Sequence, residues 1–174
     1  GTISRENRNV IRSLAGQGIA FTLVTGRMDR MTRPYVRQLG VTLPVIACNG
    51  AIIRDCASDT ILSRTAIAPD DVQTIVFWLQ RKGLDFLCYT ADAVYYPPES
   101  RRILHFRAFN ERLEREGEKS IDLFQLDDAV LSERDDFIKL LAVLPDRPSI
   151  GDAHRMLREE TRCTGALSNE TALD

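Results

Sequence analysis

The stretch IAFTLVTGR, residues 19–27, decides the fold that the sequence predicts. Its first six residues are almost continuously apolar, which is typical of a β-strand covered on both faces, as in a parallel sheet flanked by helices. An amphipathic pattern over residues 4–17 precedes it, with Ser4 in position to cap a helix and Gly18 in position to end it. We therefore expect a helix that leads directly into a buried strand ending at Thr25.

The alternation of helix and strand patterns continues further along the chain. A second helix is expected from about Thr32 to Gly40, because Pro34 is tolerated in a first helical turn and glycine favours a helix end. Residues 45–48 then give another short apolar strand, and residues 51–63 suit a hairpin with a polar tip. Helices and strands joined by short connections indicate an α/β protein with a doubly wound parallel sheet of the Rossmann-like kind.

A second unit begins near residue 67, where Pro69 opens a new helical pattern. The segments expected in it are strands at 85–89, 94–96, 137–144 and 162–167 and helices at 99–116 and 152–160. Together they predict a small α/β sandwich with an open sheet. The predicted organisation is a partial core at residues 1–66, an inserted α/β domain at 67–168 and a return to the core at 169–174.

The composition favours small-molecule partners. With 44% hydrophobic residues among 174, the chain can form an ordinary core, and its 23 basic against 25 acidic residues remove the electrostatic argument for nucleic acid or an anionic membrane surface. No apolar run approaches the length that crosses a bilayer. Four cysteines lie far apart without a C-x-x-C pair, so we expect reduced thiols in a cytoplasmic protein: Cys48, Cys56, Cys88 and Cys163.

Polar residues follow two of the predicted strands. Thr25, Gly26 and Arg27 stand at the carboxyl end of a buried strand, where open α/β sheets bind ligands. A hydroxyl, an amide without a side chain and a guanidinium at that place suit a phosphate. Asn49 and Gly50 end the next strand and are expected to share the same edge. For both groups an ordinary turn is the alternative, chosen in the second case for positive φ.

The histidines and acidic residues elsewhere in the sequence do not predict a metal site. His105 and His154 lie apart from each other and from acidic or cysteine partners at ligand spacing. Acidic pairs such as Asp70-Asp71 suit helix starts.

Four residues at strand ends and turns of the second unit are candidate contacts to the departing group of a substrate, with packing as the alternative: Tyr89, Asp92, Tyr95 and Tyr96.

Three motifs in this order resemble a known family. They are VTGR at residues 24–27, LPVIACNGAII at residues 43–53 and TRCTGALSNETALD at residues 161–174, and the likeness covers essentially the whole chain. The chain resembles the Cof-type phosphatases of the haloacid-dehalogenase-like hydrolase superfamily, which implies a core with an inserted α/β cap of type IIB. The resemblance also implies magnesium-dependent hydrolysis of small phosphomonoesters, such as sugar phosphates, nucleotides or phosphorylated cofactors, by a cytoplasmic monomer or homodimer.

The resemblance assigns roles residue by residue. Thr25 would be the catalytic hydrogen-bond donor to the transferring phosphoryl group, Gly26 would contribute an amide, and Arg27, Asn49 and the adjoining Gly50 would lie near the phosphate or the substrate. The family's nucleophile, the first aspartate of a D-x-D-G-T motif that forms an aspartyl phosphate, does not occur in the given chain, and neither do its lysine and its acidic magnesium loop. We therefore expect the given chain to be inactive by itself.

Several alternatives remain open at this point. The chain begins with Gly1 and not Met, so Gly1-Thr2 is either the end of the D-x-D-G-T motif or a remnant of processing, cloning or a gap. The main alternative function is a non-catalytic phosphate- or ligand-binding relative of the same fold. A nucleotide-binding domain of another enzyme ranks lower, because it requires a glycine-rich fingerprint where only Gly26 is present. The phosphatase interpretation requires that the Thr25 hydroxyl and the amide turn at Asn49 end neighbouring parallel strands and point into a common anion pocket.

Overall fold

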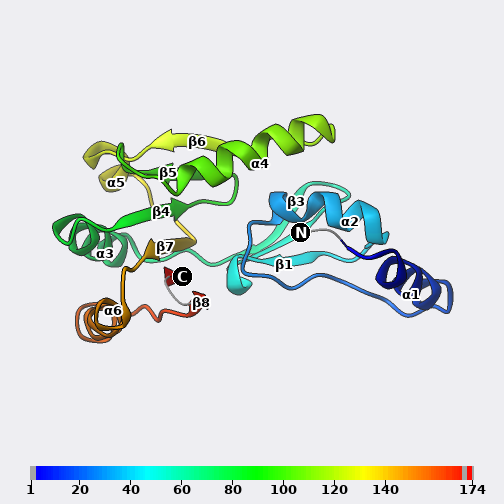
Figure 1. Ribbon diagram of the computed structural model, residues 1–174, viewed down its shortest axis with the longest axis horizontal. Coiled ribbons are helices and arrows are strands. Elements are labelled where there is room, and N and C mark those ends of the chain that lie inside the picture. Colours follow the sequence, from blue (N-terminus) through cyan, green and yellow to red (C-terminus); the bar gives the residue numbers. More distant parts are fainter. Residues whose placement is uncertain (1–2, 170–171, 174) are drawn as a thin grey trace. The chain divides into compact units, whose positions relative to one another are not determined.

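The computed structural model describes residues 3–169, 172 and 173 and divides the chain into two compact units. The first consists of the chain up to residue 65 together with residues 109–120, and the second of residues 66–108 and the chain from residue 121 onward. Both units combine helices with strands, as Figure 1 shows. The α/β class predicted from the sequence is therefore confirmed.

The first unit opens with helix α1 (Arg5–Gly16), which begins and ends close to where the sequence predicts. The Ser4 hydroxyl accepts a hydrogen bond from the Asn7 amide at 3.1 Å, which satisfies one of the donors left open at a helix start. The apolar side of α1 is only partly covered, because Val10 is 57% and Leu14 is 37% exposed. One face of this helix is therefore open to a groove.

The segment at residues 19–24 is not the strand buried on both faces that the sequence predicts. It pairs with one neighbour, strand β1 (Val45–Ala47), through a parallel bridge between Val24 and Ile46. Val24 is 71% exposed, so the prediction of two-sided burial is wrong for the described residues. Such burial needs helices packed on both sides of the strand, and in the described part of the chain the apolar side of α1 stays partly open.

The second helix follows the prediction. A short 3-10 helix, η1 (Asp29–Thr32), leads into α2 (Arg33–Leu39), which has Pro34 in its first turn. Gly40 follows as the C-cap with φ 67°, the left-handed conformation that glycine adopts without strain. The helix thus ends at the residue that the sequence indicates.

Strands β2 (Ile52–Asp55) and β3 (Thr60–Arg64) form the predicted hairpin and complete an antiparallel sheet in the order β1-β2-β3. Buried and partly buried side chains alternate along β2, and its two buried residues are Ile52 and Arg54. Arg54 is 2% exposed, so an arginine occupies a position at which this strand buries its side chains. A buried guanidinium requires negatively charged or polar partners.

The second unit contains a mixed sheet whose described strands follow the order β6-β5-β4-β7-β9-β8. β5 and β6 pair in parallel, and the other neighbouring strands are antiparallel. The apolar strand β4 is buried from Phe86 to Tyr89, which is the pattern expected of an inner strand. The strands are β4 (Asp85–Tyr89), β5 (Ala93–Tyr96), β6 (Asp122–Gln125), β7 (Lys139–Val143), β8 (Leu167–Asn169) and β9 (Ala172–Leu173).

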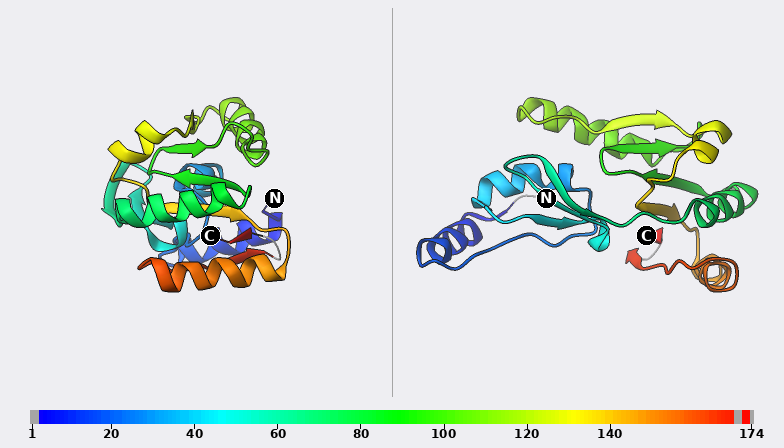
Figure 2. Two further views of the ribbon diagram at one scale, coloured as in Figure 1. Left: turned by 90° about the vertical axis from the view of Figure 1, so that its left-hand side faces the viewer. Right: turned by 180° about the vertical axis from the view of Figure 1, so that it is seen from behind.

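Helices α3 (Pro69–Arg81) and α6 (Arg147–Glu160) pack against this sheet and lie in front of its strands in the left view of Figure 2. Their apolar side chains form one core with β4 and β7, in which Val76 and Phe86 are almost fully buried. Two further helices are α4 (Ile103–Arg115) and α5 (Asp128–Glu133). No helix of the described residues is long and apolar enough to span a membrane.

Two helices of the second unit differ from the prediction. α6 begins at Arg147 instead of near residue 152, because the Asp146 carboxylate caps it by accepting from the Ser149 amide at 2.8 Å and Pro148 fits a first turn. The sequence does not predict α5, a helix of 6 residues that Asp127 caps. A helix this short has too few turns for an apolar period.

The end of the chain also differs from the prediction. The strand expected at residues 162–167 begins only at residue 167, as β8. β9 pairs antiparallel with β7, with Ala172 opposite Val143, so it extends the second sheet. The return of residues 169–174 to the core stays a prediction. Residues 170, 171 and 174 of the expected return to the core lie outside the described residues.

Candidate functional site

Thr25 and Asn49 lie at adjacent strand ends in the first unit, as the sequence predicts. The bridge between Val24 and Ile46 is parallel, so the two chain segments end at the same edge. Just beyond it, the Asn49 amide donates to the Thr25 carbonyl at 3.2 Å. The adjacency that the phosphatase interpretation requires is therefore present, whereas a common anion pocket for both groups stays a prediction.

Further main-chain hydrogen bonds join the two turns. The Cys48 amide donates to the Arg27 carbonyl at 2.9 Å, and the Thr25 amide donates to the Ile46 carbonyl at 2.9 Å. Because donors and acceptors alternate between the two segments, each turn fixes the other. The loop from Thr25 to Arg27 thus has a defined backbone position relative to the end of β1.

The turn after β1 consists of consecutive left-handed residues. φ is 50° at Cys48, 57° at Asn49 and 97° at Gly50. The sequence predicts positive φ for the Asn49-Gly50 pair, and the structure adds Cys48. Left-handed backbone costs free energy for residues other than glycine, so the hydrogen bonds to Thr25 and Arg27 must hold this turn in place.

The Thr25 side chain is prepared to donate a hydrogen bond. Its hydroxyl oxygen accepts from the Arg27 amide at 3.2 Å, which closes the loop over Gly26. A hydroxyl that accepts in this way still has its own proton for another partner. Thr25 is half-buried and Arg27 is exposed, so both can reach a ligand at this edge.

A groove of about 440 Å³ lies beside this loop. Apolar residues of α1, among them Val10 and Ile11, line it together with Leu23 and Val24. Its polar lining includes Asn7, Thr25, Arg27, Thr32 and Tyr35. Asn49 and Gly50 are exposed at the sheet edge and do not line this groove.

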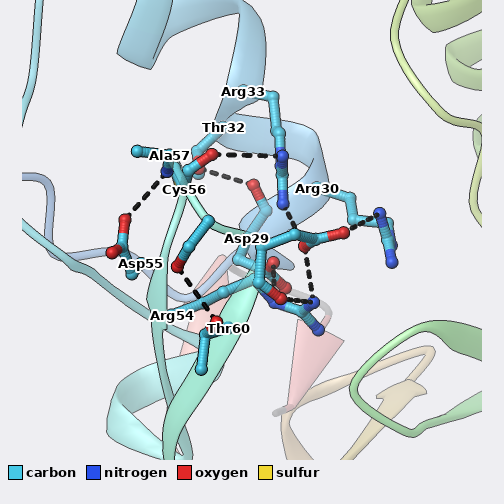
Figure 3. Close-up of polar contacts among 11 residues, drawn as sticks. Asp29, Arg30, Thr32, Arg33, Arg54, Asp55, Cys56, Ala57 and Thr60 are labelled. Carbon is cyan, nitrogen blue, oxygen red and sulfur yellow. Dashed lines mark hydrogen bonds and ion pairs between the residues drawn. The ribbon is translucent and has the colours of Figure 1, made fainter.

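A buried ion network that the sequence does not predict lies next to the loop. Arg54 Nε lies 2.7 Å from Asp29 Oδ2, and the two side chains are 3% and 1% exposed. Arg54 Nη1 also lies 2.8 Å from Asp59 Oδ1, and Arg33 and Arg30 pair with the same carboxylate. Figure 3 shows Arg30, Arg33 and Arg54 close together, with dashed lines that mark contacts of this network. The available signal was the alternation along β2, which directs Arg54 inward.

This network determines the charge of Asp59. Partial burial raises the pKa of its carboxyl group, but the hydrogen bond from Arg54 and the charges of Arg33, Arg30 and Arg54 outweigh burial. The pKa of Asp59 therefore lies below the ordinary aspartate value. Asp59 is ionised at neutral pH and can hold several guanidinium groups at once.

The aromatic candidates of the second unit take part in packing. Tyr89, Tyr95 and Tyr96 are 4%, 5% and 8% exposed. The Tyr95 ring packs edge-on against Phe137 with 5.4 Å between the ring centroids. Asp92 is half-buried. Contact of these four residues with a substrate stays a prediction.

No group of three or more His, Cys, Asp or Glu side chains in the described ranges is arranged to hold a metal ion. His105 lies edge-on to Phe106, with 6.1 Å between the ring centroids. All four cysteines are free thiols, of which Cys48 and Cys88 are buried.

A parallel strand pair whose polar turns meet at one edge is typical of α/β proteins that bind ligands at strand ends. A family model described as haloacid dehalogenase-like hydrolase matches residues 1–171, and the chain belongs to this family. Over 123 residues it is 30% identical to the 5-amino-6-(5-phospho-D-ribitylamino)uracil phosphatase of Bacillus subtilis, an alignment that covers 71% of this chain and 42% of that protein. The chain thus spans less than half the length of this curated relative.

Solved structures show the same fold. A haloacid dehalogenase-like hydrolase from B. subtilis superposes with a TM-score of 0.76 and 21% identity, covering 99% of this chain and 66% of that one. A sugar phosphatase of haloacid-dehalogenase subclass IIB superposes with a TM-score of 0.74 and 12% identity, covering 99% and 62%. At these identities the likeness establishes the fold, and the family resemblance stated from the sequence motifs is confirmed.

Proposed function

We propose that the full-length protein is a phosphatase that hydrolyses small phosphomonoesters. The observation that carries this proposal is the junction of the Thr25 loop with the Asn49 turn, joined by a main-chain hydrogen bond of 3.2 Å at one sheet edge. The family supports it, because the B. subtilis relative is named a phosphatase.

The residues of the two turns would bind and neutralise the phosphoryl group. The Thr25 hydroxyl donates to a phosphoryl oxygen, and the Arg27 guanidinium balances its charge. Gly26 lets the backbone approach closely, and the Asn49 side-chain amide and the adjoining Gly50 border the substrate. Phosphoryl transfer depends mostly on positioning and electrostatic stabilisation, which these groups supply.

The groove beside Thr25 suits a further strand. The Leu23 carbonyl and the Thr25 amide bond to Ile46 of β1, so the Val24 amide and carbonyl between them point away from β1. We propose that a strand of the full-length protein, carrying the nucleophilic aspartate that the family resemblance implies, pairs there. The apolar lining from Val10 and Ile11 would cover one of its faces.

The residues around Thr25 do not fit a magnesium site. Magnesium prefers carboxylate and water oxygens, whereas this loop offers a hydroxyl, amides and a guanidinium. The carboxylate of Asp29 in η1 is buried against Arg54. Magnesium dependence remains part of the proposal through the family, and the ion would be held by residues other than these.

The substrate class is a small phosphorylated metabolite, such as a sugar phosphate, a nucleotide or a phosphorylated cofactor. We expect the enzyme to act in the cytoplasm without nucleic acid or membrane partners, as a monomer or homodimer. An inserted α/β cap over the site would exclude bulky substrates. The domain limits of residues 1–66 and 67–168 are proposed as core and cap.

Release of phosphate by the purified full-length protein tests the proposed function. The substrates are 4-nitrophenyl phosphate and a panel of sugar phosphates, nucleotides and phosphorylated cofactors, each assayed with magnesium and with a chelator. Magnesium-dependent release supports the proposal. Binding of orthophosphate without turnover of any ester would instead favour a non-catalytic phosphate-binding relative.

A further inference from the structure

Stability alone does not explain the burial of the Asp29–Arg54 ion pair. Nε of Arg54 lies 2.7 Å from Oδ2 of Asp29, and both side chains are at most 3% exposed. Removing two charges from water costs about as much as their attraction returns, so two apolar side chains of similar volume would hold this region at least as well. The burial of the pair is better explained by the geometry that it imposes on the residues around it.

Asp29 is fixed in the turn that directly follows the Thr25–Arg27 loop. It begins η1, and its carbonyl accepts from the Thr32 hydroxyl at 2.6 Å. One residue before it, the Met28 carbonyl accepts from the Met31 amide at 3.0 Å. Because a single residue separates Asp29 from Arg27, anchoring the Asp29 side chain limits where the loop can lie.

Asp59 holds the other side of the Arg54 guanidinium. Its Oδ1 lies 2.8 Å from Arg54 Nη1, Arg33 pairs with the same oxygen, and Arg30 Nη1 lies 3.9 Å from Oδ2. Asp59 adopts φ 60° in the β2–β3 turn, and its side chain is 47% exposed. One planar guanidinium thus bridges the Asp29 carboxylate and the hairpin turn, which the single ammonium of a lysine cannot reproduce.

We propose that Arg54, oriented by Asp59, is a positioning residue that sets the Thr25–Arg27 loop through Asp29. This inference rests on the proposed function, because the reaction is what the loop is positioned for. Arg54 acts through the Asp29 side chain and the backbone that connects it to the loop. Its effect is therefore measurable at the hydrogen bonds that the loop makes.

Hydrogen exchange tests the inference independently of any reaction. The full-length protein is compared with a variant that carries Asp29→Leu and Arg54→Met together, which removes both charges and keeps the site filled. The Cys48 and Asn49 amides report on the loop, because both donate to its carbonyls. We expect these two amides to exchange at least about tenfold faster in the variant, as local opening predicts.

The Ile46 amide is the internal control for this measurement. It donates to the Leu23 carbonyl at 3.0 Å, upstream of the loop, and is expected to keep its protection. Equal acceleration at all three amides would mean that the pair only stabilises the unit, and this result overturns the inference. Unchanged exchange at Cys48 and Asn49 overturns it as well.

Kinetics with 4-nitrophenyl phosphate gives the second readout. The double variant is expected to lose at least about tenfold in kcat, with KM changed less than about threefold, because small displacements of positioned groups cost more in turnover than in binding. The single variant Arg54→Lys is expected not to reach the wild-type kcat. Asp59→Asn should lower kcat by a smaller factor. The matched control is Asp55→Asn at the end of β2, where the carboxylate accepts from the Ala57 amide at 2.8 Å, and it leaves kcat unchanged.

The two proposals fail in different ways. If the wild-type protein hydrolyses none of the esters, the proposed function fails, and the exchange of the Cys48 and Asn49 amides still decides the positioning role. If the wild type is active and the double variant keeps the wild-type kcat, the positioning role is overturned and the function stands.

Discussion

The Asn49 amide donates a hydrogen bond to the Thr25 carbonyl at 3.2 Å, so the turn after β1 is bonded directly to the end of the neighbouring segment. Because this bond uses main-chain atoms, it leaves the Thr25 hydroxyl proton and the Asn49 side-chain amide for a ligand. Two donors at one sheet edge, with the Arg27 charge nearby, would form the phosphate site that we propose and on which the predictions below depend.

Replacing Thr25 with valine is expected to lower kcat for 4-nitrophenyl phosphate about 100-fold, because one positioned donor to the phosphoryl group is lost. Steady-state kinetics of the full-length protein measures the change. Thr22→Val is the matched control, since it removes a hydroxyl that donates to the Pro44 carbonyl at 2.6 Å. It should cost about 1 kcal/mol of stability without a comparable loss of kcat. Wild-type turnover in Thr25→Val would remove this residue from the site.

The Val24 amide is expected to exchange slowly in the full-length protein, because the proposed strand in the groove would accept its hydrogen bond. Amide exchange followed by NMR or mass spectrometry checks this. The Glu6 amide in the first turn of α1 is the fast reference, since amides there lack an intrahelical acceptor. Val24 exchanging as fast as Glu6 would argue against a strand at that edge.

Asp59 makes stability depend on pH in a defined direction. Its folded-state pKa is lowered, so its ion pairs contribute fully above the ordinary aspartate pKa of about 4 and are lost as the pH falls through the folded-state value. The difference in unfolding free energy between wild type and Asp59→Asn, measured by urea unfolding, should therefore be largest near neutral pH and disappear in strong acid. Added salt should reduce it, because the carboxylate is half exposed. A difference independent of pH would contradict the assignment.

Gly40→Ala is expected to destabilise the protein by about 1 kcal/mol, because alanine at φ 67° is strained. No atom lies within 4 Å of the added methyl position, so the cost is conformational and not a clash. Gly16→Ala in α1 is the control, with the same open surroundings, and should stabilise by about 0.5 to 1 kcal/mol. Urea unfolding of both variants measures the two effects, and effects of equal sign would contradict the explanation.

The sequence predicts best those elements whose signals are local. The Ser4 cap, Pro34 in the first turn of α2, the Gly40 helix end and the period of α3 each depend on a few neighbouring residues, and the structure confirms them. The adjacency of Thr25 and Asn49 could also be inferred, because parallel strands end at a common edge.

The sequence does not predict features that depend on distant partners. The exposure of Val24 depends on which layers pack beside it, and its apolar character alone indicates burial. The Asp29–Arg54 pair joins residues 25 positions apart, and no local pattern links them. β9 pairs with β7 of the second sheet, and no local pattern in the sequence predicts this partner.

The left-handed run at Cys48, Asn49 and Gly50 would tie the proposed ligand recognition to the folding transition. An unfolded chain rarely visits three such conformations in succession, so this turn closes only after β1 has aligned with the Thr25 segment. A nascent or partly denatured molecule would consequently lack the phosphate site proposed at this edge. Phosphate esters that bind there would raise the melting temperature by mass action and would protect the newly made protein more strongly at higher concentration.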